Sequence, residues 1–184
     1  KNEMLTPKEF SERASNYAER TQAEIYAAYQ KRLVLANAMD FDDLIGNMVI
    51  LLKNFPEVSA RYRSRFRHIM VDEYQDTNMA QYELIRELCG VGTGQMGELC
   101  VVGDADQSIY AFRGANIRNI VEFERDYSNA ATVVLEQNYR STQNILSSAN
   151  SVIEKNAGRP KKNLWTAQGD GEKITIYSAA DEHH

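Results

Sequence analysis

Short apolar runs alternate with helix-like stretches in the middle of the chain. Residues 68–71 and 99–102 are two such runs, and residues 79–88 between them have helical spacing. Further strands are expected at residues 132–135 and 173–177. Short strands alternating with helices are typical of a parallel β-sheet that is covered on both sides, so the pattern predicts an α/β fold.

The first part of the chain predicts a long helix. Thr6, Pro7 and Glu9 form a helix start, with threonine as the N-cap and glutamate three residues after it. No glycine or proline follows until after residue 38, so we expect one continuous helix. Its apolar face is formed by Tyr17, Ala18, Ile25, Tyr29 and Leu33.

Three further segments have recognisable boundaries. Asp40 and Asp43 frame a second helix, which runs to about residue 53 and stops before Pro56. Residues 61–67 alternate arginine with other side chains, and we interpret them as a solvated face ahead of a strand. Ser141 is predicted to cap a helix that reaches roughly residue 156.

Composition narrows the class of protein. The chain has 184 residues, of which 43% are hydrophobic and 26% charged, as in ordered globular proteins. Its net charge of −5 excludes a uniformly basic nucleic-acid binder but leaves room for a local basic face. Cys89 and Cys100 match no metal-ligand spacing and indicate a reducing compartment, so we expect the cytoplasm. No apolar run approaches a membrane span and no secretory leader opens the chain, so no membrane partner is expected.

Residues 101–115, VVGDADQSIYAFRGA, combine two kinds of chemistry. Acids and Gln107 follow an apolar run, and Tyr110 and Phe112 then flank an alanine beside Arg113. Acid and amide groups suit a metal-bound phosphate, whereas exposed aromatic rings suit nucleobases. The segment therefore indicates nucleotide chemistry joined to nucleic-acid binding.

A second acidic segment follows the first predicted strand. Ligands of open α/β sheets lie beyond the carboxyl ends of the strands, where Asp72, Glu73 and Asp104 are expected. Adjacent strand residues point in opposite directions, so one acid could face a metal and the next a water. Alternatively, Asp72 or Asp76 only caps the following helix. Capping explains one acid but not the whole run 72–77, so we favour function.

Four motifs resemble those of the UvrD/Rep/PcrA-type superfamily 1 DNA helicases. Residues 71–78, VDEYQDTN, resemble the family's DExx box, and residues 103–115 its third motif. Residues 136–141, EQNYRS, resemble its fourth motif, and residues 40–44, DFDDL, a further signature. The resemblance implies a RecA-like P-loop NTPase core, with a partial parallel sheet flanked by helices, behind a helical N-terminal segment.

The family also implies a domain plan and an activity. Residues 1–37 would end an inserted helical subdomain, residues 38–137 form the main part of the first RecA-like ATPase domain, and residues 138–184 begin the second. The parent would be an ATP-dependent DNA helicase that moves on single-stranded DNA and unwinds duplex DNA, in repair or replication. Its cofactors would be ATP and Mg²⁺. The alternatives are the ATPase region of a helicase-nuclease subunit and a non-catalytic interaction module.

The resemblance assigns roles around the nucleotide. Asp72 would hold Mg²⁺, and Glu73 would orient and deprotonate the water that attacks the γ-phosphate. Gln107 would sense that phosphate, and Arg140 would act as an arginine finger. Tyr139 would stack on adenine; the alternative is a tyrosine packed at a helix start.

The resemblance also assigns DNA contacts. Tyr110 and Phe112 lie two residues apart, so in an extended loop they share a side and would stack on single-stranded DNA, each contact contributing about 1–3 kcal/mol. The alternative is a pair of ordinary core aromatics. Phe112 stands where many relatives have tryptophan, which leaves less ring area for stacking. Arg113 either contacts DNA or braces the motif.

One family feature is missing from the sequence. A phosphate-binding loop needs a lysine followed by Ser or Thr, and no lysine here has that neighbour. The nearest imitation places Glu98 where that lysine belongs, so residues 90–97 are interpreted as a flexible surface loop. In the family the phosphate-binding loop lies N-terminal to the region seen here, and later motifs lie beyond it. The resemblance therefore implies an internal part of a larger motor, which should not hydrolyse ATP alone because it lacks the phosphate loop and most of the second lobe. Whether His183 and His184 are native or a purification tag stays open.

Overall fold

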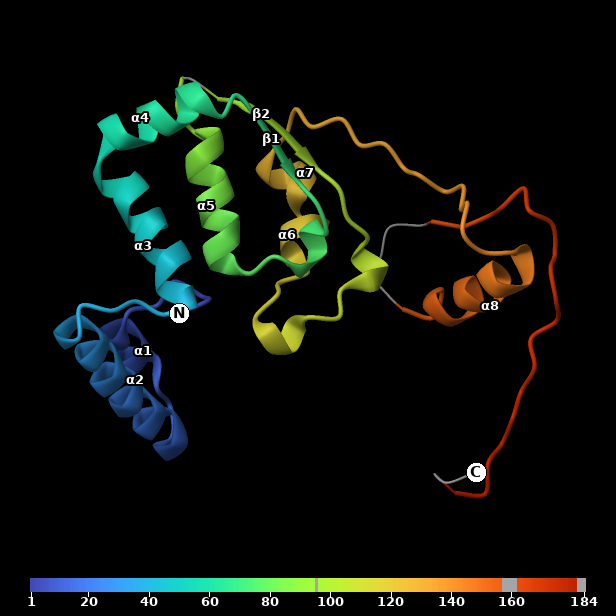
Figure 1. The fold of residues 1–184 in the computed structure, drawn as a ribbon, viewed down its shortest axis with the longest axis horizontal. Coiled ribbons are helices and arrows are strands. Elements are labelled where there is room, and N and C mark those ends of the chain that lie inside the picture. Colours follow the sequence, from blue (N-terminus) through green and yellow to red (C-terminus); the bar gives the residue numbers. More distant parts are fainter. Residues whose placement is uncertain (95, 157–161, 182–184) are drawn as a thin grey trace. The chain divides into compact units, whose positions relative to one another are not determined.

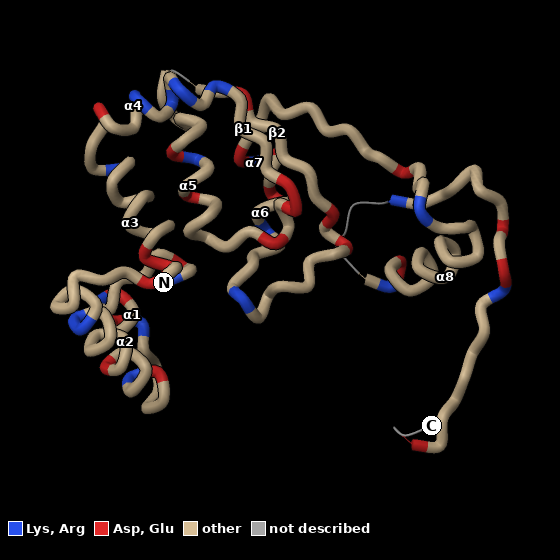
Figure 2. Tube along the Cα trace, viewed as in Figure 1, with Lys and Arg blue, Asp and Glu red and all other residues tan. Residues whose placement is uncertain are grey.

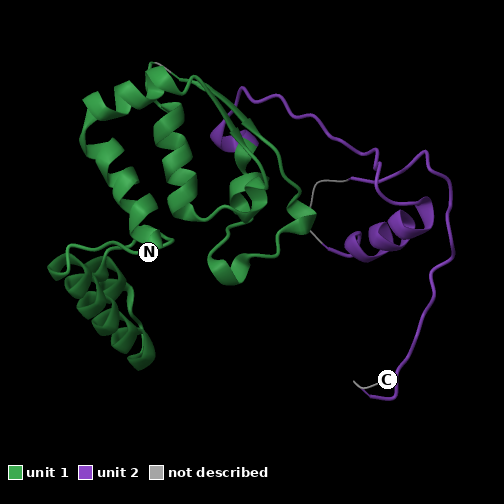
Figure 3. Cartoon of the chain, viewed as in Figure 1, with its two compact units in different colours: residues 1–123 green, residues 124–184 purple. Residues whose placement is uncertain are grey.

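A computed structural model describes residues 1–94, 96–156 and 162–181. The chain divides into two compact units, Lys1–Phe123 and Glu124–His184 (Figures 1 and 3). His183 and His184 lie outside the described residues, as does residue 95 of the predicted surface loop. No helix in the described part of the chain is long and apolar enough to cross a membrane.

The single long helix predicted at the start of the chain is wrong. The chain instead forms α1 (Pro7–Arg13) and α2 (Tyr17–Leu35), although Thr6 and Glu9 make the predicted capping box. The break has a local cause. Asn16 accepts a hydrogen bond from the Glu19 amide (2.9 Å), which caps α2 and ends the helical path through residues 14–16.

The apolar face predicted for this region is also largely wrong. Tyr17 is 85% exposed, and Ile25 and Tyr29 are exposed as well. The buried side of α2 instead carries Ala23, and Tyr26 meets Phe10 of α1 edge to face at 6.3 Å. The packing of α1 against α2 therefore selects a different stripe from the one that periodicity suggests.

The next two helices begin as their sequences predict. Asp40 and Asp43 form a reciprocal capping box at the start of α3 (Phe41–Asn54). Pro56 not only follows α3 but occupies the first turn of α4 (Pro56–Arg65). The alternating arginines thus lie mainly on a helix, where Arg61 and Arg65 are exposed and Arg63 pairs with Glu87 (3.3 Å).

The predicted pair of parallel strands is present. Strand β1 (His68–Val71) pairs with β2 (Glu98–Val101), and α5 (Met79–Cys89) connects them. One face of the sheet packs on α5 and its neighbours, whereas Met70 and Cys100 on the other face are exposed. The described residues therefore cover one face, not both as the pattern predicted. The core consists of Tyr74, Tyr82, Ile85 and Cys89 with Ile69, Val71, Leu99 and Val101 against it.

Short 3-10 helices and helices follow the strands: η1 (Tyr74–Asp76), η2 (Ala105–Gln107), η3 (Ala111–Arg113), α6 (Arg118–Val121), α7 (Phe123–Asp126) and α8 (Gln143–Ile153). The strands predicted at residues 132–135 and 173–177 do not form. Only the isolated bridge between Gln137 and Trp165 pairs extended backbone among the described residues after Phe123. The N-cap of α8 is Thr142, one residue later than predicted.

Candidate functional site

Asp72 and Glu73 directly follow β1, and both are exposed. Figure 2 shows acidic positions, in red, beyond the ends of β1 and β2. Glu73 adopts the left-handed conformation (φ 49°, ψ 43°), which is uncommon for a residue with a side chain and costs on the order of 1–3 kcal/mol. Its amide donates to the Asp72 carboxylate (2.9 Å). The strained turn sends the chain from β1 into η1 and leaves two carboxylates at the strand end.

Gln75 joins the ends of the two strands. Its side chain is buried, with 1% exposed, and its amide nitrogen donates to the Glu73 carboxylate (2.8 Å). Its amide oxygen accepts from the Asp104 backbone (3.0 Å). The approach requires glycine at position 103, where a Cβ would lie 2.6 Å from that same oxygen. In the sequence, only its position inside the acidic run marks Gln75, and this does not predict a role for it.

The network continues to Gln107. The side-chain amide of Gln107 donates to the Asp104 carboxylate (2.7 Å), and the Ser108 hydroxyl donates to the backbone carbonyl of Gln75 (3.3 Å). A chain of hydrogen bonds thus leads from Glu73 through Gln75 and Asp104 to Gln107. The structure places the sequence-predicted acids and Gln107 at one edge of the sheet.

The capping alternative for the acidic run is wrong. Asn78 is the N-cap of α5, and it forms a reciprocal capping box with Gln81. Asp76 belongs to η1, and the Asp72 carboxylate accepts from Glu73 next to it rather than from α5. The acids are therefore not needed to start this helix.

The acid set fits one class of metal ion. The described residues contain no group of three or more His, Cys, Asp or Glu side chains that could enclose a metal. Mg²⁺ bound with a nucleotide needs only one or two protein carboxylates, since phosphate oxygens and water supply the other ligands. Asp72, exposed at the strand end, could serve as such a ligand.

Tyr110 and Phe112 form a pair on a turn rather than on an extended loop. Their ring centroids are 5.9 Å apart with an interplanar angle of 36°. Phe112 is 79% exposed and Tyr110 is also exposed, so the core alternative is wrong. The Arg113 guanidinium lies 5.4 Å from one ring centroid and 5.8 Å from the other, and it braces the pair.

The aromatic turn returns to the acidic segment. Ala115 forms an antiparallel bridge with Asn78, and the Asn116 amide donates to the Thr77 carbonyl (2.9 Å). Buried Asn119 donates to the same carbonyl and to the Thr77 hydroxyl, both at 3.0 Å. Both ends of residues 104–116 are thus tied to residues 75–78.

Tyr139 and Arg140 lie in the second unit, and both are exposed. The Asn138 side chain accepts from the Arg140 amide (2.8 Å) and the Ser141 amide (2.7 Å), which forms a tight turn ahead of α8. Tyr139 is 75% exposed and donates its hydroxyl to Gln137 (3.0 Å). It does not pack at the helix start, so that alternative is wrong.

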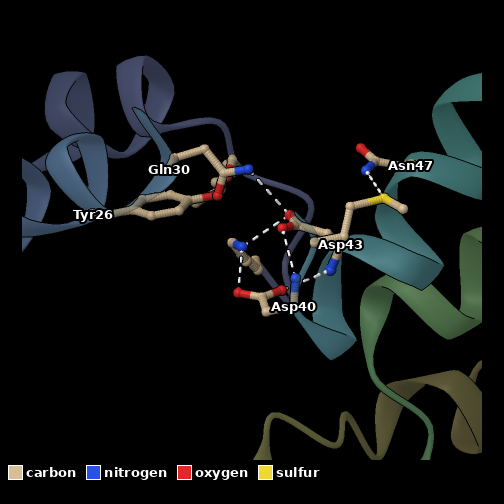
Figure 4. Close-up of polar contacts among 8 residues, drawn as sticks. Tyr26, Gln30, Asp40, Asp43 and Asn47 are labelled. Carbon is tan, nitrogen blue, oxygen red and sulfur yellow. Dashed lines mark hydrogen bonds and ion pairs between the residues drawn. The ribbon is translucent and has the colours of Figure 1, made fainter. Parts of the chain in front are cut away.

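The DFDDL segment forms a separate polar network (Figure 4). The Lys1 ammonium bridges Asp40 (2.5 Å) and Asp43 (2.8 Å), and Gln30 of α2 donates to Asp43 (3.2 Å). Burial alone would lower the pKa of Lys1, but hydrogen bonds and charges from the two aspartates outweigh it and raise that pKa. The network ties α2 and the start of the chain to α3.

Both parts of the chain match models of known protein families. The UvrD/REP helicase N-terminal domain matches residues 1–128, and the UvrD-like helicase C-terminal domain matches residues 133–184. The chain belongs to the UvrD/REP helicase family. Its fold is therefore the family's RecA-like α/β fold, represented here by the β1–β2 sheet and its helices.

Relatives from several bacteria are similar along the whole chain. ATP-dependent DNA helicase UvrD1 of Mycobacterium bovis is 59% identical over all of this chain. ATP-dependent DNA helicase PcrA of Leuconostoc citreum is 52% identical over 100% of it, and PcrA of Bacillus subtilis is 50% identical over 99%. The chain spans 24% of the length of each of these relatives.

Proposed function

We propose that the chain is part of an ATP-dependent DNA helicase that moves along single-stranded DNA and unwinds duplex DNA. One observation carries this proposal. Buried Gln75 bonds both the carboxylate of Glu73 and the backbone that leads to Gln107 and the aromatic turn. Groups suited to phosphate chemistry and groups suited to base stacking therefore share one rigid connection.

Glu73 and Asp72 divide the acid chemistry. Asp72 would hold Mg²⁺, which would offset negative charge on the phosphate oxygens. Glu73 accepts a proton from the attacking water at a carboxylate oxygen. Gln75 donates to the Glu73 carboxylate and keeps it oriented, because the glutamine itself is held by the Asp104 backbone.

Three neutral or basic side chains have further proposed roles toward the nucleotide. Gln107 contacts the γ-phosphate, and the short segment between Gln107 and Tyr110 transmits the presence of that phosphate to the aromatic turn. Arg140 supplies a fixed positive charge to the transferred phosphoryl group, and the exposed ring of Tyr139 stacks on adenine. Closure of the two RecA-like domains on ATP would then shift the grip on DNA.

Tyr110 and Phe112 bind single-stranded DNA by stacking on its bases. Their exposure and the Arg113 guanidinium beside them support this role. Stacking tolerates any base, as movement along DNA requires.

The wider assignments rest on the same proposal. Residues 1–37 end an inserted subdomain, residues 38–137 belong to the first RecA-like domain, and residues 138–184 begin the second. We place the protein in the cytoplasm, in DNA repair or replication. Both cysteines are free thiols, in keeping with a reducing compartment.

The experiment is DNA-stimulated ATP hydrolysis and strand separation by the longer protein that carries this sequence. Gln75→Ala should lower kcat about 10- to 100-fold, since it removes a hydrogen bond to a charged group. Gln22→Ala, which changes an exposed glutamine of α2, is the matched control. A longer protein with no DNA-stimulated ATPase would favour the non-catalytic interaction module, and nuclease activity would favour the helicase-nuclease subunit.

A further inference from the structure

Residues 1–5 precede α1 and contact both α5 and the aromatic turn that carries Tyr110 and Phe112, within the first unit. The Asn2 carbonyl accepts a hydrogen bond from the Ala80 amide (3.0 Å) in the first turn of α5. Its side-chain amide donates to the Arg113 carbonyl (3.2 Å), at the end of η3. One half-buried asparagine thus joins α5 to the turn that carries the exposed rings.

The contact with the turn is close enough to restrict the sequence there. Gly114 adopts φ 84°, and a Cβ at this position would lie 3.2 Å from both the Asn2 Cβ and its amide nitrogen. Any side chain would be strained by the backbone conformation and would press against Asn2. Gly114 therefore lets Asn2 reach the Arg113 carbonyl.

Asn2 is itself held on both sides. Lys1 is bound by Asp40 and Asp43 at the start of α3, and the Leu5 carbonyl accepts from the Tyr26 hydroxyl of α2 (3.0 Å). An amide between two anchored points loses little conformational entropy when it binds the turn. Residues 1–5 are therefore held in place before DNA binds, and they support the aromatic turn.

We propose that Asn2 is a positioning residue for DNA binding: it fixes the Arg113 backbone, and so holds Tyr110 and Phe112 ready to stack on bases. This inference rests on the proposed function. Arg113 connects Asn2 to the rings, because its guanidinium lies beside both rings while its carbonyl accepts a hydrogen bond from Asn2. Without that bond the turn samples other arrangements, so part of the free energy of DNA binding is used to order it.

The test uses the longer protein, with a fluorescent oligothymidylate as the probe. Asn2→Ala and the shape-conserving Asn2→Asp, which cannot donate to Arg113, should weaken binding about three- to tenfold, as expected for one net hydrogen bond. The DNA concentration for half-maximal ATPase stimulation should rise by the same factor, with kcat at saturating DNA retained. Asn47→Ala, which removes an exposed amide whose contact is the Met39 sulfur, is the control.

A double-mutant cycle separates positioning from a general structural role. In a Tyr110→Ala, Phe112→Ala background, Asn2→Ala should have no further effect on oligothymidylate binding. Wild-type affinity in both Asn2 variants would overturn the inference, as would a fall in kcat at saturating DNA or an undiminished effect in the double-alanine background. Failure of the proposed function is distinct, since the wild-type protein itself would then show no DNA-stimulated ATPase.

Discussion

Two sets of short apolar runs in this chain are similarly rich in strand-forming residues, but only one set forms strands among the described residues. Residues 68–71 and 98–101 pair with each other as β1 and β2, and Leu99 packs against the core. Residues 132–135 and 173–177 are just as β-prone but form no strand, and Leu135 is 76% exposed. The difference teaches that a strand is defined by its partner, because isolated extended backbone makes no hydrogen-bonded ladder.

The chemistry follows the same division. Where the strands pair, Glu73 is joined to Gln107 by a continuous set of hydrogen bonds. Tyr139 and Arg140 instead lie on an exposed turn, where the Tyr139 carbonyl accepts from Gln168 and the Asn138 amide donates to Trp165 (2.7 Å), without a strand ladder beside them in the described part of the chain. Strand pairing therefore holds the proposed base in place, whereas the proposed arginine finger lies on an exposed turn that is held by single hydrogen bonds.

The largest test of this contrast is Glu73→Gln in the longer protein. Removing the base from the preorganised edge should lower kcat for ATP hydrolysis by about 10² to 10⁴-fold while nucleotide binding remains. Steady-state ATPase assays and fluorescent-nucleotide titration measure the two effects. Glu57→Gln, an exposed change in the first turn of α4, is the control. Normal turnover in Glu73→Gln would remove this residue from its proposed role.

A second test compares Cys89 of α5, in the core against the covered face of the sheet, with Cys100 of β2 on its exposed face. Burial raises the pKa of the Cys89 thiol to about 11, so at pH 8 it is protected and protonated, whereas Cys100 is exposed. Alkylation by iodoacetamide should therefore be on the order of 100-fold faster at Cys100. Peptide mass spectrometry over time measures both rates, with Cys100→Ser isolating the slow site. Equal alkylation rates at Cys89 and Cys100 in the native protein would contradict the burial of one cysteine and the exposure of the other.

A matched pair of leucine substitutions tests the strand contrast itself. Leu99→Ala should lower the free energy of unfolding by about 2 kcal/mol, because it removes core contacts. Leu135→Ala should change it by less than about 0.5 kcal/mol, because that side chain is exposed. Urea unfolding followed by circular dichroism measures both. Similar losses would mean that residues 132–135 are packed in solution.

The smallest effect concerns a helix start. Asp40→Ala should lower the free energy of unfolding by about 1 kcal/mol at pH 7, because α3 loses its N-cap. Asp42→Ala, an exposed neighbour in the same turn, is the control. Thermal unfolding as a function of pH measures the difference.

The pH dependence follows from the direction of the Asp40 shift. Burial alone would raise its pKa, but hydrogen bonds from Lys1, the Asp43 amide and Tyr29 outweigh this and lower it. The carboxylate's contribution is therefore complete above the unfolded pKa of about 3.9 and is lost as pH falls through the lower folded pKa. The difference in the free energy of unfolding between wild type and Asp40→Ala should therefore narrow as pH falls through that pKa. A difference that stays constant with pH would contradict this prediction.

Local signals predicted the features that neighbours along the chain can satisfy. The capping boxes at Thr6 and Asp40, the helix of α5 and the two central strands all follow from residue types at fixed spacing. The break at Asn16 carries a signal as well, a capping residue followed by Glu19, but the absence of glycine and proline through residue 38 favours a continuous helix. The roles of Asp72, Glu73, Tyr110 and Phe112 stay predictions.

The sequence by itself determined the motif order, the family resemblance and the acids at the ends of two strands. Only the tertiary structure decided which apolar runs become strands, which face of α2 is buried, and that Gln75 and Asn2 connect distant segments. The reason is that strand pairing and buried amides draw their partners from far along the chain. Periodicity and capping describe only a few neighbouring residues, so these long-range partners emerge only when the chain is folded.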